Sequence, residues 1–263
     1  MRPLDQMPQA QVATVFTDID DTLTTDGKLS ALAYEALEEL QQAGLRVIPV
    51  TGRPAGWCDQ IARLWPVDGI IGENGALYMW HDAHTGKLRT RHLLDEESRA
   101  GNAARLAAVC QRILREVPGC AVASDQFCRQ YDLAIDFCED VPPLPRAAVD
   151  RIVQIMEESG MTAKISSIHV NGWFGDYDKL SMARLMMRER YGIDLADKAE
   201  RDRCVFAGDS PNDAPMFAYF PLSVGVANVL EFADRLAHAP HFITRQPCGA
   251  GFAELTRHLL ARP

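Results

Sequence analysis

The sequence has 263 residues and no apolar run near the ~20 residues that a membrane-spanning helix needs. Its first eleven residues, MRPLDQMPQAQ, have no apolar core of the kind found in signal peptides. We expect these residues to form a short, loose leader before the first strand. We therefore expect a cytoplasmic protein that makes no contact with a membrane.

Positive charge is also scarce. Lys and Arg number 27 against 36 Asp and Glu, which gives a formal net charge of −9. A charge of this sign argues against nucleic acid or an anionic membrane as the partner. It does not exclude a phosphorylated small molecule, because a local cationic site fits within an acidic protein. The sequence leaves both a monomer and a homodimer open.

Cysteines are few, and none forms a C-x-x-C pair. Their number is odd, and several stand within apolar runs, so we expect reduced thiols. A zinc site is the alternative, but the three cysteines that could form one do not have the spacing of the usual zinc knuckles. Those three are Cys120, Cys128 and Cys138, and the other cysteines are Cys58, Cys110, Cys204 and Cys248.

An acidic stretch follows the first apolar segment of the chain. Residues 12–16 predict a buried strand, and Asp18, Asp20 and Asp21 come directly after it. Carboxylates at positions i and i+2 leave a strand on the same face, so Asp18 and Asp20 can share a divalent cation. An acidic turn that closes a surface hairpin is the other interpretation of this stretch taken alone.

Strands and helices alternate at both ends of the chain. This pattern predicts an α/β fold with a Rossmann-like parallel sheet and helices on both faces. Between the two ends the pattern changes to a hairpin, a long helix and further strands, which predicts an inserted α+β domain. We place the core at residues 1–81 and 176–263 and the inserted domain at 82–175. The strands predicted near the insertion are 76–80, 87–93, 120–124, 127–137, 161–166 and 168–174.

Polar residues follow several of the predicted core strands. Thr51, Gly52 and Arg53 come after the second strand, and Asp209 and Asp213 follow a later one. In addition, Lys179 opens the first helix after the insertion. Ligands of open parallel sheets bind beyond the carboxyl ends of the strands, so we expect these residues to converge there.

Four short motifs in this order resemble those of the haloacid dehalogenase superfamily. The inserted domain is placed like the large cap (C2B-type) of its Cof-type, sugar-phosphatase-like branch, which includes sucrose-phosphate and mannosyl-3-phosphoglycerate phosphatases. Asp21 stands where the family usually has glycine. The matching segments are Asp18-Ile19-Asp20-Asp21-Thr22, Thr51-Gly52-Arg53, Lys179, and Gly208-Asp209-Ser210-Pro211-Asn212-Asp213, and Glu73-Asn74-Gly75 before the cap also resembles this branch.

The resemblance implies a Mg²⁺-dependent phosphomonoesterase. Asp18 would be the nucleophile that forms an aspartyl-phosphate, and Asp20 the general acid and then the base. Mg²⁺ would be held by Asp18, Asp209 and the Asp20 carbonyl, with Asp213 supporting them from behind. A helix N-cap is the alternative role for Asp213.

The phosphoryl group would be bound by a second set of residues, again as the resemblance implies. These are Thr51, the Gly52 amide and Lys179, with Ser210 and Asn212 able to donate hydrogen bonds nearby. Taken alone, a lysine at the start of a helix is usually solvated. Arg53 either reaches the phosphate or forms a surface salt bridge.

The cap should select the leaving group. The branch implies a sugar phosphate or a glycosyl-phosphoglycerate as the small-molecule substrate. A phosphomutase is a second hypothesis, which would use cap arginines at 89, 91 and 129, and a non-catalytic binding module is a third. We predict substrate contacts at Arg53, Arg129, His169 and Asn171, and the other polar or aromatic candidates are Arg91, His92, Asp125 and Trp173.

Overall fold

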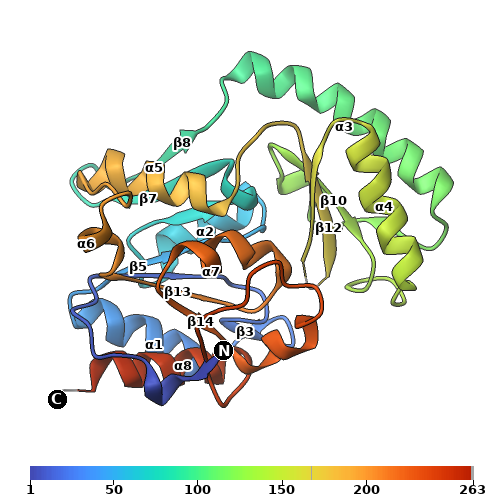
Figure 1. Ribbon diagram of the computed structural model, residues 1–263. Coiled ribbons are helices and arrows are strands. Elements are labelled where there is room, and N and C mark those ends of the chain that lie inside the picture. The colour runs from blue at the N-terminus through green and yellow to red at the C-terminus, as the bar shows by residue number, and fades with distance from the viewer. Residues whose placement is uncertain (167, 262–263) are drawn as a thin grey trace.

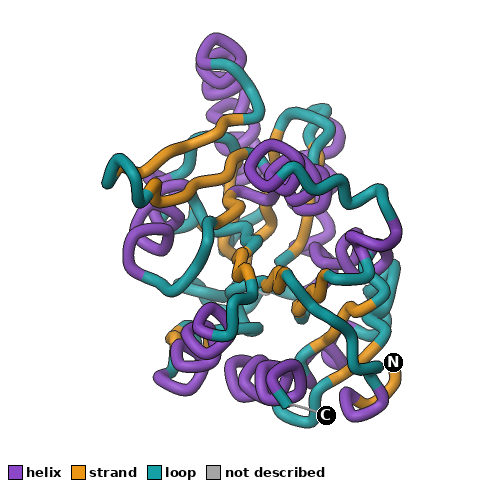
Figure 2. The backbone as a smooth tube through the Cα atoms, turned by 90° about the vertical axis from the view of Figure 1, so that its left-hand side faces the viewer, coloured by secondary structure: helices purple, strands orange, loops and turns teal. Residues whose placement is uncertain are grey.

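The computed structural model describes residues 1–166 and 168–261. The chain builds a parallel sheet covered by helices, and a smaller antiparallel sheet stands beside it (Figure 1). Figure 2, turned by 90°, shows both termini near the lower edge, away from the helices at the top. The predicted α/β class with an inserted α+β unit is confirmed.

The central sheet has six strands in the order β1-β15-β14-β13-β2-β5, and every pairing is parallel. Parallel pairing requires a crossover between neighbours, which is why these strands alternate with helices along the chain. The strands are β1 (Arg2–Pro3), β2 (Thr14–Thr17), β5 (Arg46–Pro49), β13 (Cys204–Gly208), β14 (Leu222–Gly225) and β15 (Phe242–Ile243).

Helices cover both faces of this sheet (Figure 1). In β2, Val15 packs in the core with α1 and α8, whereas Phe16 packs with α5 and α7 on the other face. This alternation is the expected period of a strand that is buried on both sides. The helices of the core are α1 (Ala31–Gln42), α2 (Ala55–Leu64), α5 (Lys179–Tyr191), α6 (Lys198–Arg201), α7 (Ala214–Tyr219) and α8 (Cys248–Leu260).

The first residues are not a loose leader, so that prediction was wrong. Strand β1 pairs with β15 through Arg2↔Phe242 and Pro3↔Ile243. A short 3-10 helix at Leu4–Gln6 follows, and Leu4 and Met7 are buried in the main core. Two apolar side chains in a polar segment are a weak sequence signal, but the open edge of β15 gives the backbone a partner.

An antiparallel hairpin connects the core to the inserted unit. Strands β6 (Ile70–Gly72), β7 (Leu77–Asp82) and β8 (Lys87–His92) form a three-stranded sheet. A parallel bridge between Val50 and Ile71 attaches this sheet to the core. The boundary predicted at residue 82 falls inside the β7–β8 hairpin, and the division of the chain into domains remains a prediction.

We call residues 95–173 the cap, from the Asp95 N-cap of α3 to the end of β12. Its four-stranded antiparallel sheet has the order β11-β12-β10-β9. A 3-10 helix at Gln126–Cys128 interrupts the strand predicted for 127–137, so β10 is shorter. The cap elements are α3 (Glu96–Glu116), β9 (Ala121–Val122), β10 (Asp132–Asp136), α4 (Arg146–Glu158), β11 (Thr162–Ile165) and β12 (His169–Trp173).

The cap has its own apolar core between its sheet and its helices. Ile113, Ile135, Ile152 and Val170 are fully buried there. On β12, Val170 points into this core, so the alternate residues His169 and Asn171 lie on the opposite face of the cap sheet. That face lies over the carboxyl ends of the central strands.

The remaining short elements are a hairpin and three 3-10 helices. The hairpin pairs β3 (Thr24–Thr25) with β4 (Lys28–Leu29). The 3-10 helices are Glu73–Gly75, Pro211–Asp213 and Ala227–Phe232, the last of which was predicted as an ordinary helix. None of the helices in the described ranges has the length and apolar composition that a membrane crossing requires.

Candidate active site

The carboxyl ends of β2 and β13 lie side by side and deliver acids from both strands. Thr17 is in register with Ala207, and the Asp18 amide donates to the Ala207 carbonyl at 2.8 Å. Asp18 and Asp209 therefore leave adjacent strands at the same edge. Both side chains are almost fully buried.

Lys179 lies between the carboxylates of Asp18 and Asp213, the latter from the loop after β13. Its Nζ atom donates to Asp18 Oδ1 and to Asp213 Oδ1, each at 2.6 Å. The start of α5 is held by a close approach to Gly75, where a Cβ atom would lie 2.1 Å from the Asp178 carbonyl oxygen. Only glycine fits at this contact, so the residue before the hairpin sets the position of the lysine.

Asp213 braces the loop after β13. Its Oδ2 accepts from the amides of Asp209, at 3.0 Å, and Ser210, at 3.3 Å. A Cβ atom on Gly208 would lie 2.4 Å from the same oxygen, so the loop can close only around glycine. The carboxylate of Asp213 thus holds the backbone that carries Asp209, and also pairs with Lys179.

Burial and mutual repulsion make these acids reluctant to ionise together. Desolvation raises the pKa of Asp18 to about 8, with Asp213 and Asp20 adding to the rise and Lys179 opposing it. Burial also raises the pKa of Asp209 well above its usual range, reinforced by Asp18 and Asp213. Burial works against the charge of Lys179, but the two carboxylates outweigh it and raise the pKa of the lysine.

Three of the acids form a group that fits a divalent cation. Oxygen atoms of Asp18, Asp209 and Asp213 all lie within 4.8 Å of one another, and the three side chains are buried. One lysine does not balance three carboxylates. An oxygen-rich, negatively charged group of this kind matches the ligand preference of Mg²⁺.

The loop after β5 supplies backbone and hydroxyl groups to the same edge. Thr51 is fully buried, and its Oγ1 accepts from the Arg53 amide at 3.0 Å. Gly52 lines the cavity together with Asn212, whose Oδ1 accepts from Ser210 Oγ at 2.8 Å. Both loops therefore face the cavity above Asp18.

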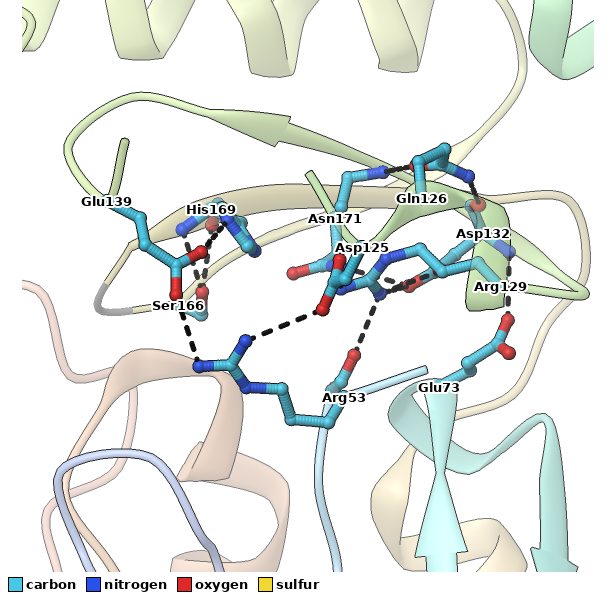
Figure 3. A network of polar contacts seen from close by, with 12 residues as sticks. Arg53, Glu73, Asp125, Gln126, Arg129, Asp132, Glu139, Ser166, His169 and Asn171 are labelled. Carbon is cyan, nitrogen blue, oxygen red and sulfur yellow. Dashed lines mark hydrogen bonds and ion pairs between the residues drawn. The ribbon is translucent and has the colours of Figure 1, made fainter. Parts of the chain in front are cut away.

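The cap closes this cavity with a network of charged and polar contacts (Figure 3). Arg129 Nη1 donates to the Gly52 carbonyl at 2.9 Å and to Asp132 at 3.0 Å. Asn171 Nδ2 donates to Asp132 Oδ2 at 3.0 Å. From the core, Arg53 Nε donates to both oxygens of Asp20 at 3.0 Å.

The enclosed cavity is small. Its space for water-sized molecules is about 20 Å³, and its walls include Asp18, Asp20, Arg53 and His169. This is enough for one or two waters. A substrate therefore needs the cap to move or side chains to rearrange before it can reach Asp18.

Comparison with known proteins identifies the family. The model of the haloacid dehalogenase-like hydrolases matches residues 15–100. A phosphoglycolate phosphatase of Pyrobaculum neutrophilum is 30% identical over 93% of this chain and 94% of its own. This chain is a haloacid dehalogenase-like hydrolase. A second relative, the phosphoglycolate phosphatase of Methanopyrus kandleri, is 27% identical over 94% of this chain and 96% of its own.

Solved structures share the fold of this hydrolase. A protein of Thermoplasma acidophilum superposes with a TM-score of 0.70 at 18% identity, covering 95% of this chain and 99% of its own. The sucrose-phosphatase of Synechocystis, solved with sucrose and phosphate, has a TM-score of 0.64 at 17% identity, covering 97% and 100%. The family and its named relatives make the hydrolase a phosphatase.

Most residues predicted for the site of this hydrolase meet at one edge of the sheet. Asp18, Asp20, Gly52, Arg53 and Asn212 line the cavity with the cap residues Arg129, His169 and Asn171. Lys179, Asp209 and Asp213 lie directly behind Asp18 through the contacts described above. Thr51 is next to them but is covered.

Other candidates lie elsewhere. Arg91 pairs with Glu189 on α5, and His92 lies against the Tyr131 hydroxyl at 3.1 Å. Trp173 is buried and stacks on Tyr177, so it packs the junction between cap and core. Of the three arginines that a mutase was expected to use, Arg89 pairs with Asp82 at 3.6 Å, away from the cavity.

The backbone conformation of Asp21 accounts for an aspartate at the position where the family usually has glycine. Its backbone has a φ of +54°, in the left-handed region that glycine adopts most easily and that Asp tolerates. Its amide donates to Thr24 Oγ1 at 3.0 Å, which supports the turn locally. Asp21 therefore adopts a backbone conformation that glycine, the usual residue of the family at this position, would also adopt easily.

Three residues near the site were not given roles by sequence reasoning. Thr22 Oγ1 donates to Asp209 Oδ1 at 3.3 Å, and Asn228 Nδ2 donates to Asp209 Oδ2 at 3.2 Å. Asn228 comes shortly after β14, so the rule that strand ends carry the site would have found it. The third, Glu73, belongs to the segment before the cap that resembles the family branch; it is fully buried and accepts from backbone amides of both core and cap, a role that the resemblance did not give it.

Proposed function

We propose that this phosphatase is a Mg²⁺-dependent phosphomonoesterase that works through an aspartyl-phosphate on Asp18. The observation that carries the proposal is the buried group of Asp18, Asp209 and Asp213, two of which, Asp18 and Asp213, contact Lys179. A nucleophilic carboxylate splits phosphate ester hydrolysis into two steps, and a cation must offset the repulsion between carboxylate and phosphate.

Asp18 is the nucleophile in this proposal. Lys179 contacts Oδ1 of Asp18 at 2.6 Å, which leaves Oδ2 to attack the phosphorus. The same lysine offsets negative charge on the phosphoryl oxygens as the bond to the leaving oxygen breaks. Asp213 keeps the lysine in place from the other side at 2.6 Å.

Asp20 is the general acid and then the general base. It lies on the wall of the same cavity as Asp18, two residues further along the chain, where it can reach the leaving oxygen. It donates a proton to that oxygen, and in the second step it takes a proton from the water that attacks the aspartyl-phosphate. Arg53 orients it through the contacts at 3.0 Å.

Mg²⁺ would be held by Asp18, Asp209 and the carbonyl of Asp20, with Asp213 bracing the loop of Asp209. When bound, it supplies positive charge that brings the phosphate and the carboxylates together. Thr51 and the amide of Gly52, with Lys179 and Asn212, would bind the transferring phosphoryl oxygens. Thr22 and Asn228, which donate to the Asp209 carboxylate, would limit its movement when it holds such a cation.

The first substrate to test is phosphoglycolate. Two relatives that cover more than nine tenths of the chain carry that name. The cavity has Arg53, Arg129 and His169 in its walls, which favours a molecule that carries a carboxylate beside the phosphate over a sugar phosphate. Sugar phosphates, the expectation from the sequence, belong in the same panel.

The test is release of inorganic phosphate from phosphoglycolate, glucose 6-phosphate and 4-nitrophenyl phosphate, with Mg²⁺ and with EDTA. We expect turnover to require Mg²⁺ and to fall by roughly 10⁴-fold in Asp18→Asn. Asp59→Asn is the control, because the Asp59 side chain is 46% exposed on α2, where it pairs with Arg63 and does not line the cavity. Full activity in Asp18→Asn, or turnover that EDTA leaves intact, would contradict the mechanism. A preference for glucose 6-phosphate would contradict the substrate alone.

A further inference from the structure

Arg53 is surrounded by more negative charge than it can balance. Its side chain is only 8% exposed and contacts three carboxylates, of which one, Asp20, belongs to the core. The other two belong to the cap (Figure 3). Asp20 is held closely, with contacts of 2.9 Å and 3.0 Å. The cap carboxylates of Asp125 and Glu139 lie further away, at 3.5 Å and 3.4 Å. One side of the guanidinium, Nε and Nη2, is thus closely paired with Asp20. Its cap-facing side is loosely paired, since Nη1 contacts Asp125 at 3.5 Å and Glu139 shares Nη2 with Asp20 at 3.4 Å.

Glu139 also contacts a second cap residue. His169 Nε2 lies 2.8 Å from Glu139 Oε2, yet among the described residues it has no aligned hydrogen-bond partner. His169 is only 3% exposed, and it lines the cavity above Asp18. A buried ring nitrogen that is close to a carboxylate but poorly aligned with it is unusual in a folded protein, and another acceptor could replace that carboxylate.

Space is available beside Glu139. A second hollow of about 400 Å³ adjoins the catalytic cavity, and Asp20, Arg53 and Glu139 lie in its walls. Asp20 and Arg53 also line the catalytic cavity, so Arg53 stands between the two spaces. The Glu139 side chain is 31% exposed, so it can turn into the hollow without crossing the cap core.

We propose that Arg53 and His169 bind a carboxylate on the leaving group of the substrate, and that Glu139 occupies this position when no substrate is bound. The inference rests on the proposed phosphatase function and narrows its substrate class to phosphate esters of short hydroxy acids. The incoming carboxylate takes hydrogen bonds from the loosely paired side of Arg53 and from His169 Nε2, and Glu139 moves into the adjoining hollow.

The arrangement links recognition to the chemistry of the leaving group. Arg53 Nε and Nη2 keep their contacts with Asp20, while the carboxylate binds Nη1 and takes the longer contact to Nη2 that Glu139 leaves. In the phosphate ester of a 2-hydroxy acid, a single carbon separates the carboxylate from the bridging oxygen. A carboxylate bound at Arg53 therefore brings the bridging oxygen close to Asp20, the residue that must protonate it.

The experiment compares two substrates that differ only in charge. These are phosphoglycolate and its carboxamide analogue, 2-phosphooxyacetamide, assayed by phosphate release with Mg²⁺. In the wild-type protein we expect a clear preference for the carboxylate in kcat/KM. In Arg53→Gln we expect that preference to fall by about 30-fold, the size of one charge-assisted hydrogen-bonding group, and in Arg53→Lys by less.

For Glu139→Gln we expect the opposite effect, namely better use of phosphoglycolate. A neutral amide competes less well for Arg53, so we expect KM for phosphoglycolate to fall several-fold while KM for the carboxamide changes little. Arg63→Gln and Glu157→Gln are the matched controls, since both residues are exposed on helices, α2 and α4. Melting temperatures of all variants identify any that fail to fold, and Glu139→Gln with Arg53→Lys then carries the test.

The outcomes separate the two proposals. If the wild type prefers the carboxamide, the substrate is not a phosphorylated acid, and the proposed binding of a carboxylate by Arg53 is refuted as well. If the wild type prefers phosphoglycolate but the Arg53 variants lose both substrates equally, the substrate proposal stands and the role of Arg53 is overturned. An unchanged or higher KM for phosphoglycolate in Glu139→Gln overturns the role of Glu139.

Discussion

Replacing Glu73 tests how the core holds the closed cap. Glu73 is fully buried, and its carboxylate accepts from the Ala55 amide of α2 at 3.0 Å and from three consecutive cap amides. Those of Gln130, Tyr131 and Asp132 lie at 2.9 Å, 2.6 Å and 3.2 Å. One side chain therefore joins the start of the core helix α2 to the start of β10, a strand of the cap sheet.

Removal of this carboxylate has a large expected cost. Glu73→Ala leaves four buried N–H groups without an acceptor, each worth about 1 kcal/mol or more, so we expect about 4 kcal/mol of lost unfolding free energy. We also expect faster amide hydrogen exchange in the segment 130–132, because its donors lose their partner. Global unfolding alone would not single out that segment.

The isosteric change Glu73→Gln adds a pH dependence with a definite sign. Burial and the nearby Asp132 raise the pKa of Glu73 from 4.5 to about 7. The folded state thus binds more protons than the unfolded state, and the stability from this group is complete below about pH 4.5 and is lost as pH rises through about 7. One pKa unit corresponds to about 1.4 kcal/mol, so the loss is about 3 kcal/mol.

Urea unfolding at about pH 5 and about pH 8 measures this effect. Because glutamine does not titrate, we expect the wild type to lose about 2.5 kcal/mol of unfolding free energy relative to Glu73→Gln between the two pH values, the rest of the loss lying below pH 5. Glu157→Gln, on the exposed face of α4, should show no such movement. A difference that moves toward the wild type would mean that the four amides hold Glu73 ionised, and the reasoning from burial would be refuted.

Three further predictions concern the site and the N-terminus. Lys179→Met removes the cation between Asp18 and Asp213, so we expect at least a 1,000-fold lower kcat/KM and a lower melting temperature, and wild-type turnover would refute its role. Chelation of Mg²⁺ should abolish phosphate release, and added Mg²⁺ should restore it and raise the melting temperature, whereas a melting temperature indifferent to Mg²⁺ would argue against binding at this group. Leu4→Ala should lower the unfolding free energy by about 2–3 kcal/mol with kcat unchanged, since Leu4 is buried far from the cavity, and a neutral result would mean that the β1 segment contributes little.

Much of the catalytic edge could be predicted from residue order. Apolar strands that each end in polar residues place those residues together, because parallel strands point their carboxyl ends the same way. Asp18, Asp209 and the Thr51–Arg53 segment followed this rule. Asn228 obeys it too, after β14, and was missed only because a single amide gives a weaker signal than an acid.

The cap was harder to predict. Its helices and its two pairs of neighbouring strands could be recognised in the sequence. The sequence did not predict which face of the cap sheet would meet the core. Arg91 and Arg129 have the same chemistry in the sequence. One pairs with Glu189 outside the site and the other reaches the Gly52 carbonyl, because β8 belongs to the connecting hairpin while Arg129 precedes β10.

The sequence by itself determined the class of fold and the meeting of Asp18 and Asp209, because both depend on local periodicity and on the direction of parallel strands, whereas the place of Lys179 beside them came from the order of the family motifs. Tertiary structure alone decided the partners of each charge. Arg53 contacts Asp20, Asp125 and Glu139, which stand 33, 72 and 86 residues away along the chain. Pairings over such separations depend on how the cap docks on the core, and docking leaves no period in the sequence.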